Sequence, residues 1–508
     1  MRRWTVKYGD ARIPEGFFFR RSPTNRSHRE PYRDGDGAFF RHLSTFPEAS
    51  TIKAAMLEML TLARRHIFFC NFLLEDDEVV EALLAAAQRL RGHVYVLTTL
   101  KEDDLKSSAE FLTDADESGE GDFQRHRARV EKLSRQGLLI KARSDCHAKF
   151  LTIDDEQAIV TSANAVPTCY GNVSKPNGGI REANAENGVW INVIPEVRRL
   201  ANFFRAIWRE GCNYMVAPDR NVFDVQQLRP EPVPIHPCEP RLPTSSGTVL
   251  WTAPNDLRLK QCMLDMLHQA QRRVSLSTWV VKGIDQHEIG QALRQTAERG
   301  VNIELLARGM NRRDDLRQQC YWLSHAAGSN LTIRGDFWNH SKAVVVDDRD
   351  ALILTANLDA QHGLDAGVEV GFRSHDPEFV TAVSKFLDRL HGEAAFRFVC
   401  DPTQAEVSRE QHRDLPLPSR WIVRNNNPSA IRIREFENWM DSIPRELIVV
   451  ATSNANDFSL RSSRGTLVMR QTSHDEFAAL RIESLPKGRR VALPFSGYLC
   501  PCEIIAEC

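Results

Sequence analysis

Apolar side chains in the first third of the chain recur at two alternating spacings. Residues 51–65 (TIKAAMLEMLTLARR) are apolar at helical spacing, and the next apolar run, HIFFCNFL, has the length of a strand. The segment DDEVVEALLAAAQRLRG then indicates a helix with an acidic start, and HVYVLTTL indicates another strand. Helices and strands that alternate at these lengths predict βαβ units around a largely parallel sheet.

The same order of elements returns in the second half of the chain. A helical pattern over 256–273 precedes the strand-like VSLSTWVV, the helical QHEIGQALRQTAERG and the strand-like VNIELLAR. Each copy continues into a hairpin pattern, HAKFLTI to AIVTSAN in the first and HSKAVVV to ALILTAN in the second. The repeat predicts two pseudo-symmetric α/β lobes with mixed, largely parallel sheets.

A proline-rich segment separates the two copies. RPEPVPIHPCEPRLPTSSG holds six of the 24 prolines of the chain, which is typical of a stiff connector. The patterns on its two sides predict an arginine-rich N-terminal extension at 1–50, a first lobe at 51–225, the linker at 226–248, a second lobe at 249–400 and a small C-terminal α+β accessory domain at 401–508.

One polar pattern stands in both hairpins at identical spacing. It consists of a His, a Lys two positions later, an Asp and an Asn, and it spans 17 positions in each copy: His147, Lys149, Asp154 and Asn164, then His340, Lys342, Asp347 and Asn357. Residues two apart on a strand face the same side, so each imidazole and ammonium should point together. A single strand histidine is more often a core or surface residue than a catalyst. The repetition of the whole set favours function.

Pseudo-twofold packing would bring both sets into one pocket. Lysines and amides neutralise and orient a phosphoryl group, while one histidine attacks phosphorus and the other protonates the leaving oxygen. This chemistry requires no metal and no cofactor. Cys500, Cys502 and Cys508 lack a second ligand pair at metal-binding spacing, and we interpret them as ordinary thiols.

These residues carry a family resemblance. HAKFLTID and HSKAVVVD resemble the HxKxxxxD signature of the phospholipase D superfamily, and TSAN and LTAN resemble its GSxN element. The resemblance covers about 51–397. It implies two phospholipase D-like lobes and a metal-independent enzyme with a phosphohistidine intermediate that water or an alcohol resolves.

The resemblance also implies a role for each matched residue. One histidine is the nucleophile and the other the acid; we favour His147 as the nucleophile and His340 as the acid, and the reverse assignment stays open. A further glutamate follows in this family, and Glu186 and Glu369 stand where it is expected, to orient the histidines. The expected phosphate-binding residues are Lys149, Lys342, Ser162, Asn164, Thr355 and Asn357, and Asp154 and Asp347 complete the catalytic set in a supporting role.

The chain departs from the family pattern at one position in the first copy and at two in the second, where Thr355 also replaces the serine. Thr161 and Leu354 replace the glycine of GSxN, before Ser162 and Thr355. Both hydroxyls are retained, with a tighter fit expected in the second copy. Every His, Lys and Asp of the signature is present, so we expect an active enzyme rather than an inactive scaffold.

Composition narrows the class of protein further. The chain has 508 residues, 42% of them hydrophobic and 26% charged, as folded multidomain proteins do. Its 66 Lys+Arg against 67 Asp+Glu give a net charge of -1, so a polyanion would have to meet a local patch. The N-terminus lacks the apolar stretch of a secretory signal, and the eleven cysteines fit reduced thiols, so the sequence predicts a cytoplasmic protein.

The motif defines the bond that is cleaved but leaves the substrate open, because the superfamily includes phospholipases, phosphatidyltransferases such as cardiolipin synthases, and nucleases. Arginine clusters at 1–41, 124–129 and 308–317 favour nucleic acid, as do Phe337 and Trp338 beside His340. The phenylalanines at 17–19 favour phospholipid. We predict a nuclease; the alternative is a phospholipid-directed phospholipase D or phosphatidyltransferase.

A third class is a binding protein that docks a protein partner through its C-terminal domain. Replacement of His147 separates this class from the enzymes, because a scaffold would keep its activity in cells. Both half-sites lie on one chain, so the active site does not require an oligomer.

Overall fold

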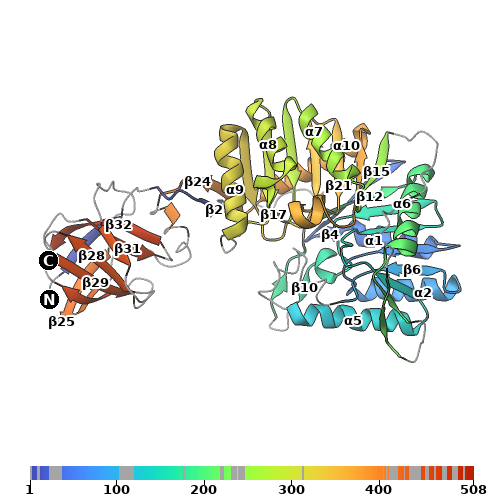
Figure 1. The fold of residues 1–508 in the computed structure, drawn as a ribbon, viewed down its shortest axis with the longest axis horizontal. Helices are drawn as coiled ribbons and strands as arrows, with labels where there is room; N and C mark the ends of the chain where they lie inside the picture. The colour runs from blue at the N-terminus through green and yellow to red at the C-terminus, as the bar shows by residue number, and fades with distance from the viewer. Residues whose placement is uncertain are drawn as a thin grey trace. The chain divides into compact units, whose positions relative to one another are not determined.

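The computed structural model describes residues 3–8, 12–21, 37–101, 119–174, 178–217, 222–229, 237, 246–309, 311, 314–403, 406–407 and 410, and the strands from 421 onward. The chain divides into two compact units. One is formed by 21–397, and the other by 1–20 together with 398–508. The unit formed by 21–397 contains both copies of the repeat (Figure 1).

The first lobe alternates strands and helices in the order that its sequence predicts. Its elements are β3 (Phe40–Phe46), β4 (Ala49–Ser50), α1 (Thr51–Leu62), β5 (Ile67–Cys70), α2 (Asp77–Arg89), β6 (Val94–Leu97), α5 (Gly119–Arg135), β7 (Leu139–Ala142), β8 (Phe150–Ile153), β9 (Gln157–Thr161), η2 (Pro167–Cys169), β10 (Val173–Ser174), β11 (Ile180–Arg181), β12 (Glu186–Ile191), α6 (Ile194–Ala206), η3 (Ile207–Gly211), β13 (Tyr214–Val216) and β14 (Val225–Gln227).

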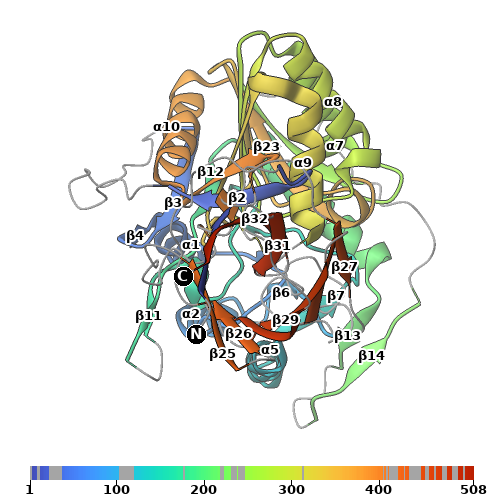
Figure 2. The ribbon, with the colours of Figure 1, turned by 90° about the vertical axis from the view of Figure 1, so that its left-hand side faces the viewer.

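The strands of this lobe form one mixed sheet in the order β14-β13-β7-β6-β5-β8-β9-β12-β3-β4. The pairs β5–β6 and β6–β7 are parallel, and the hairpin β8–β9 and its neighbours are antiparallel. β3 pairs with β12 (Figure 2), although the sequence places 1–50 outside the lobe. Its buried positions include His42, Ser44 and Thr45, so it lacks the apolar pattern that reveals a core strand.

The second lobe repeats this architecture. Its elements are β15 (Gly247–Thr252), α7 (Arg258–Gln269), β16 (Arg273–Ser277), β17 (Val281–Lys282), η4 (Ile284–Gln286), α8 (Glu288–Glu298), β18 (Asn302–Ala307), α9 (Asp314–Ala327), η5 (Gly328–Asn330), β19 (Leu331–Gly335), β20 (Ala343–Val346), β21 (Asp350–Leu354), β22 (Leu358–Asp359), η6 (Ala360–Leu364), β23 (Glu369–Ser374), α10 (Pro377–Glu393) and β24 (Phe396–Cys400).

Its sheet has the order β15-β23-β21-β20-β16-β18-β19-β24, with parallel pairs at β16–β18 and β18–β19. β15 pairs with β23 as β3 pairs with β12. Each lobe therefore begins with a strand that joins its sheet before the first helix. The α/β fold of two pseudo-symmetric lobes with mixed sheets that the sequence predicts is confirmed. The parallel pairing holds only where a helix connects successive strands, at β5–β6, β6–β7, β16–β18 and β18–β19, and the other pairs of the two sheets are antiparallel, so the sheets are not largely parallel.

Local sequence signals place the helix starts. Ser50 caps α1 through a hydrogen bond from the Lys53 amide, and Asp76 and Asp376 cap α2 and α10 in the same way. The acidic first turn of α2 also interacts favourably with the helix dipole.

A shared apolar core joins the two lobes. It includes Phe204 from α6 and Val189 from β12 of the first lobe, together with Trp251, Phe372 and Phe386 from the second. Phe203 of α6 stacks on Trp251 with ring centroids 5.0 Å apart. Each large apolar side chain buried in this way contributes about 1.5–3 kcal/mol. The interface therefore holds the two halves of the repeat in a defined orientation.

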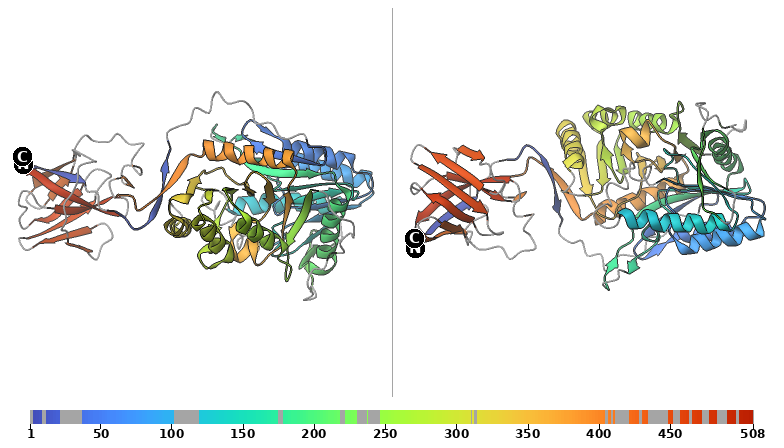
Figure 3. Two further views of the ribbon diagram at one scale, coloured as in Figure 1. Left: turned by 90° about the horizontal axis from the view of Figure 1, so that it is seen from above. Right: turned by 60° about the horizontal axis from the view of Figure 1, so that its bottom comes forward.

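Most of the described strands of the unit formed by 1–20 and 398–508 form antiparallel sheets. β1 (Arg3–Tyr8) lies between β25 and β32 in an antiparallel sheet of order β26-β25-β1-β32-β31, and Figure 3 shows this blue strand among red ones. The second sheet has the order β27-β28-β29-β30. The bounds are β2 (Gly16–Arg20), β25 (Trp421–Asn427), β26 (Ala430–Ile433), β27 (Ile448–Ala451), β28 (Asp457–Ser462), β29 (Gly465–Gln471), β30 (Phe477–Ile482), β31 (Arg490–Phe495) and β32 (Tyr498–Glu507).

Two of the aromatic residues near the N-terminus are buried within this unit. Phe17 and Phe19 pack with Ile13 and Val407 in a small apolar cluster. The phenylalanines at 17–19 are 0–8% exposed, so in this structure they do not form a membrane-facing surface. Within the described ranges, every helix is too short or too polar to cross a bilayer.

Candidate active site between the lobes

The two copies of the His–Lys pattern meet where the lobes join. His147 and His340 lie in extended segments directly before β8 and β20. The amide of His147 donates to the carbonyl of Val368 at 3.0 Å, and the amide of His340 donates to the carbonyl of Ala185 at 3.0 Å. Val368 and Ala185 directly precede the two glutamates. Backbone hydrogen bonds therefore hold each histidine against the opposite lobe.

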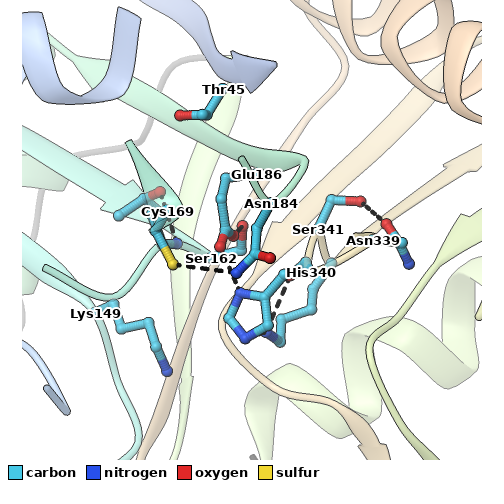
Figure 4. A network of polar contacts seen from close by, with 12 residues as sticks. Thr45, Lys149, Ser162, Cys169, Asn184, Glu186, Asn339, His340 and Ser341 are labelled. Carbon is cyan, nitrogen blue, oxygen red and sulfur yellow. Dashed lines mark hydrogen bonds and ion pairs between the residues drawn. The ribbon is translucent and has the colours of Figure 1, made fainter. Parts of the chain in front are cut away.

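Each imidazole is paired with the glutamate of the other lobe. Nδ1 of His147 lies 2.9 Å from Oε1 of Glu369, and Nδ1 of His340 lies 2.6 Å from Oε1 of Glu186. Figure 4 shows Glu186 of β12 and His340 of the segment before β20 approaching one another. A carboxylate at Nδ1 holds the proton there and fixes the tautomer and orientation of the ring. Nε2 is therefore the ring atom available for chemistry.

A buried lysine lies against each Nε2. Nζ of Lys149 is 2.8 Å from Nε2 of His147, and Nζ of Lys342 is 3.2 Å from Nε2 of His340. Each ammonium also donates to the carbonyl of its own histidine, at 2.8 Å and 3.1 Å. Both lysines are 0% exposed. A phosphate oxygen placed between an ammonium and a ring nitrogen would meet a cation without the cost of reorganisation.

The two hydroxyls predicted to bind phosphate contact the glutamates in this structure. Ser162 Oγ donates to Oε2 of Glu186 at 2.5 Å, and Thr355 Oγ1 donates to Oε2 of Glu369. Each hydroxyl also accepts from the backbone after its glutamate, from the amides of Asn187 and Val370 at 3.0 Å. The hydroxyls therefore hold the carboxylates that orient the histidines, and their contact with substrate stays a prediction.

The two aspartates of the signature face away from this chemistry. Oδ1 and Oδ2 of Asp347 accept three backbone N–H groups, from Gln271, Arg272 and Arg273, at 2.7–2.9 Å. Asp154 accepts the matching set in the first lobe, from residues 64–66. Both contacts join the turn of the hairpin to the loop before β5 or β16. This placement supports a structural role for both aspartates.

The asparagines Asn164 and Asn357 are 5% and 4% exposed. The carboxamide oxygen of Asn357 has no hydrogen-bond partner among the described residues. The part of both asparagines in phosphate binding stays a prediction.

Asn187 is a site residue that the sequence did not reveal. Its Nδ2 donates to the carbonyl of Lys342 at 3.1 Å, and its Oδ1 accepts from the amide of Lys342 at 3.1 Å. The second lobe has Val370 at the matching position, so this link between the lobes is asymmetric. The only signal in the sequence is an amide directly after Glu186, where its counterpart is apolar.

Aromatic rings cover the two histidines at matching positions. Phe72 packs edge-on against His147 with centroids 5.2 Å apart, and Trp279 packs edge-on against His340 at 4.9 Å. The guanidinium of Arg308 lies 4.0 Å from the Trp279 ring centroid. Phe72 and Trp279 each follow the end of a strand in the repeat, which is the signal that could have identified them.

Cys169 adds a third donor at Glu186. Its thiol, 1% exposed, hydrogen-bonds to this carboxylate. Burial, followed by the charge of Glu186, raises the pKa of Cys169 well above its ordinary value. Burial also acts to raise the pKa of Glu186, but the charge and hydrogen bond of His340 outweigh it, so the pKa of this carboxyl is lowered. Glu186 is therefore held as a carboxylate.

A comparison with protein-family models agrees with this geometry. The model described as "Cardiolipin synthase, PLD-like domain" matches residues 56–208 and 263–391, more than half of the chain. The chain belongs to the phospholipase D-like family. The two matched regions lie in the two lobes, and each contains one copy of the His–Lys pattern.

Solved structures of low sequence identity resemble parts of the chain. They include a polyphosphate kinase from Porphyromonas gingivalis (14% identity, 69% of this chain and 50% of that chain, TM-score 0.43), a phosphatidylserine synthase from Haemophilus influenzae (16% identity, 70% and 87%, TM-score 0.49) and Nuc, a phospholipase D family member from Salmonella typhimurium (15% identity, 30% and 97%, TM-score 0.26). The chain spans half the length of the polyphosphate kinase. The comparison with curated proteins found no match.

Proposed function

We propose that this protein is a metal-independent phosphodiesterase that cleaves nucleic-acid backbones through a phosphohistidine intermediate. The contacts in the site account for each step. Two imidazoles provide a nucleophile and an acid, two ammoniums neutralise the phosphoryl oxygens, and two carboxylates orient the rings.

In the first step, Nε2 of His147 attacks phosphorus and forms an N–P bond while the P–O bond to the leaving group breaks. Nε2 of His340 gives its proton to the departing oxygen. In the second step, His340 takes a proton from water, and the resulting hydroxide displaces His147 from phosphorus. An alcohol in place of water would give transfer instead of hydrolysis. Lys149 and Lys342 lie where they can stabilise the charge that develops on the phosphoryl oxygens.

The asymmetry of the two His–Glu pairs supports His147 as the nucleophile. Glu186 accepts from His340, Ser162 and Cys169, whereas the described donors to Glu369 are His147 and Thr355. Fewer donors leave more of the charge of Glu369 facing His147, the imidazole that we assign as the nucleophile. The side chain of His147 is also 14% exposed, against 4% for His340.

The observation that carries the nucleic-acid assignment is Arg308, stacked on Trp279 directly beside His340. Guanidinium groups bind backbone phosphates in a fork geometry, and aromatic faces accept unpaired bases. In the first lobe, the charges of three arginines act on the carboxylate of Glu75: Arg125, Arg129 and Arg181. The backbone N–H of Glu75 donates to the carbonyl of Ala165, the residue after Asn164. Because Arg125 and Arg129 are already paired with Glu75 and Asp77, the assignment rests on Arg308.

A phospholipid substrate is the second candidate, because an apolar hollow adjoins the site. Its lining includes Phe46, Leu306, Trp338 and Leu390, and it reaches Ala185 and Asn339, the neighbours of Glu186 and His340. Such a surface suits an acyl chain. The carboxylates of Glu182, Asp336 and Glu393 also line it, which would repel a nucleic-acid backbone in that direction.

The experiment compares substrates under conditions that remove divalent metals. Labelled single- and double-stranded DNA and RNA, and anionic phospholipid vesicles, are incubated with the full chain in excess EDTA, with His147→Ala as the inactive control. We expect cleavage of a nucleic acid that His147→Ala abolishes. Cleavage of phospholipid alone would transfer the assignment to the second candidate, and activity that survives His147→Ala would contradict the mechanism.

A second comparison tests the role of Arg308. Arg308→Gln should weaken nucleic-acid binding and lower the slope of log affinity against log salt by about 0.7–0.9, because one phosphate contact is lost. Arg294→Gln is the matched control, since Arg294 stacks on Trp322 at 5.0 Å within α8 and α9. Equal losses in the two variants would argue against substrate contact at Arg308. The predicted docking of a protein partner on the C-terminal domain stays a separate hypothesis.

A further inference from the structure

The candidate acid and two neighbouring side chains form a cluster of three possible metal ligands. Cys169, Glu186 and His340 each offer one ligand atom, and these atoms all lie within 4.8 Å of one another. The three residues are 1%, 0% and 3% exposed. Figure 4 shows them converging from three segments of the chain.

The thiol has no task in the phosphoryl-transfer steps above. Cys169 is the last residue of the short helix η2, and the side-chain Nδ2 of Asn184 donates to its sulfur at 3.7 Å. Asn184 is itself tied to this helix, because its backbone N–H donates to the carbonyl of Thr168 at 2.8 Å. The sulfur is therefore held in place at the Glu186–His340 pair by contacts independent of that pair.

We propose that Cys169, Glu186 and Nδ1 of His340 form an inhibitory site for a thiophilic divalent metal ion of the zinc class. Sulfur, imidazole nitrogen and carboxylate oxygen are the three donor types that zinc takes in proteins, at about 2.0–2.3 Å, with a fourth position open to water. Tetrahedral coordination needs ligand atoms about 3.3–3.7 Å apart. The 2.6 Å contact between Glu186 and His340 would open slightly, and the sulfur would move inward.

The charges and protons of this step balance. The thiol of Cys169 and Nδ1 of His340 each release one proton to solvent as the metal–sulfur and metal–nitrogen bonds form, and Nε2 of His340 keeps the proton that it holds as the acid. A thiolate and a carboxylate then neutralise the two charges of the ion. Lys342 opposes binding, because its ammonium lies 3.2 Å from Nε2 of His340 and repels a further cation beside that ring.

The site is present in only one half of the repeat among the described residues. At the Glu369–His147 pair, the cysteine nearest in sequence is Cys146, and its sulfur lies 3.8 Å from that of Cys70 instead. The described residues contain no other group of three such ligands. We therefore expect one ion among the residues that the structure describes.

Binding at this site would remove the acid from the reaction. An ion on Nδ1 separates His340 from Glu186 and turns the ring away from its catalytic position. Zinc should then inhibit an enzyme that needs no metal, and chelators should restore it. The inhibition rests on the proposed function, whereas binding of the ion does not.

The test measures binding on the metal-stripped full chain. Zn²⁺ is titrated calorimetrically, and Co²⁺ serves as the spectroscopic probe, because a thiolate ligand gives cobalt an intense near-ultraviolet charge-transfer band. We expect one equivalent to bind, a thiolate band with the unmodified chain, and affinity at least about tenfold weaker with loss of the band in Cys169→Ala. Cys169→Ser keeps the volume of the side chain and should also lose the band.

Cys262→Ser is the matched control, because Cys262 is a buried cysteine of α7 outside the cluster. It should bind metal as the unmodified chain does. The proposal is wrong if cobalt gives no thiolate band with the unmodified chain, or if Cys169→Ala binds zinc equally well. These readouts need no turnover, so a failure of the proposed function would be recognised separately. Where cleavage is measurable, zinc inhibition is normalised to the metal-free rate of each variant.

Discussion

Oε1 of Glu186, in the first lobe, lies 2.6 Å from Nδ1 of His340, in the second. The reciprocal pair, Glu369 and His147, spans the same interface at 2.9 Å. Neither lobe therefore holds a complete His–Glu unit. This exchange explains why the shared apolar core matters for chemistry, since a shift between the lobes would lengthen both hydrogen bonds at once.

Neutralising either glutamate should slow cleavage by at least about 100-fold, because an amide does not hold the imidazole in its reactive form. Glu369→Gln should slow formation of the covalent adduct. Glu186→Gln should slow departure of the leaving group. Single-turnover kinetics with alkyl and 4-nitrophenyl leaving groups separate these two effects. Identical leaving-group dependence in the two variants would contradict the assignment of roles.

His340→Ala tests the acid directly. With a nucleotide leaving group, its rate should fall by about 10²–10⁴-fold, the usual contribution of general acid catalysis. With bis(4-nitrophenyl) phosphate, the departing phenolate needs no proton, so the first step should persist and the second should not. We expect a burst of one nitrophenolate per chain. A burst from His147→Ala, and none from His340→Ala, would reverse the two roles.

The aspartates of the signature should act on stability. Asp347→Asn removes one of the two oxygens that accept three backbone N–H groups, and it should cost about 1–3 kcal/mol of unfolding free energy. The folded fraction of this variant should turn over substrate at the rate of the unmodified chain. Asp348→Asn is the control, since this neighbour in the same turn is 52% exposed at its side chain. Denaturant unfolding at neutral pH gives the comparison; an inactive Asp347→Asn of normal stability would place Asp347 in the chemistry.

His42 should make the fold sensitive to acid. Burial lowers the pKa of this imidazole from 6.5 to about 3, so the folded state excludes a proton that the unfolded chain takes up. The stability is fully present above pH 6.5 and decreases as pH falls from there toward 3, by about 1.4 kcal/mol per pH unit for this proton.

His42→Phe should flatten that dependence, because the ring packs between Phe379 and Phe386, with centroids 6.4 Å and 5.2 Å away. Unfolding free energies at pH 7, 6 and 5 check it. An unchanged pH slope would show that other groups carry the acid sensitivity. Burial also lowers the pKa of His391, to about 4, so some slope should remain in the variant.

The sequence predicted the elements of both lobes because each has its own periodicity, from α1 and β5 to the hairpin β20–β21. It could not predict β3, whose buried positions include His42 and Ser44, since their burial depends on partners far along the chain. It likewise placed the glutamates with the histidines but gave no sign that the pairs cross between lobes. Cys169 and Asn187 joined the site only in three dimensions, because nothing in their spacing repeats.

The most direct test of the account is to trap the intermediate on the enzyme. The full chain is mixed with a radiolabelled phosphodiester substrate in excess EDTA and quenched in alkali, where phosphohistidine survives, and the labelled peptide is identified by mass spectrometry. We predict a phosphoryl adduct on His147 that forms at the rate of turnover and accumulates in His340→Ala. Substrate turnover with no adduct on either His147 or His340 would contradict it.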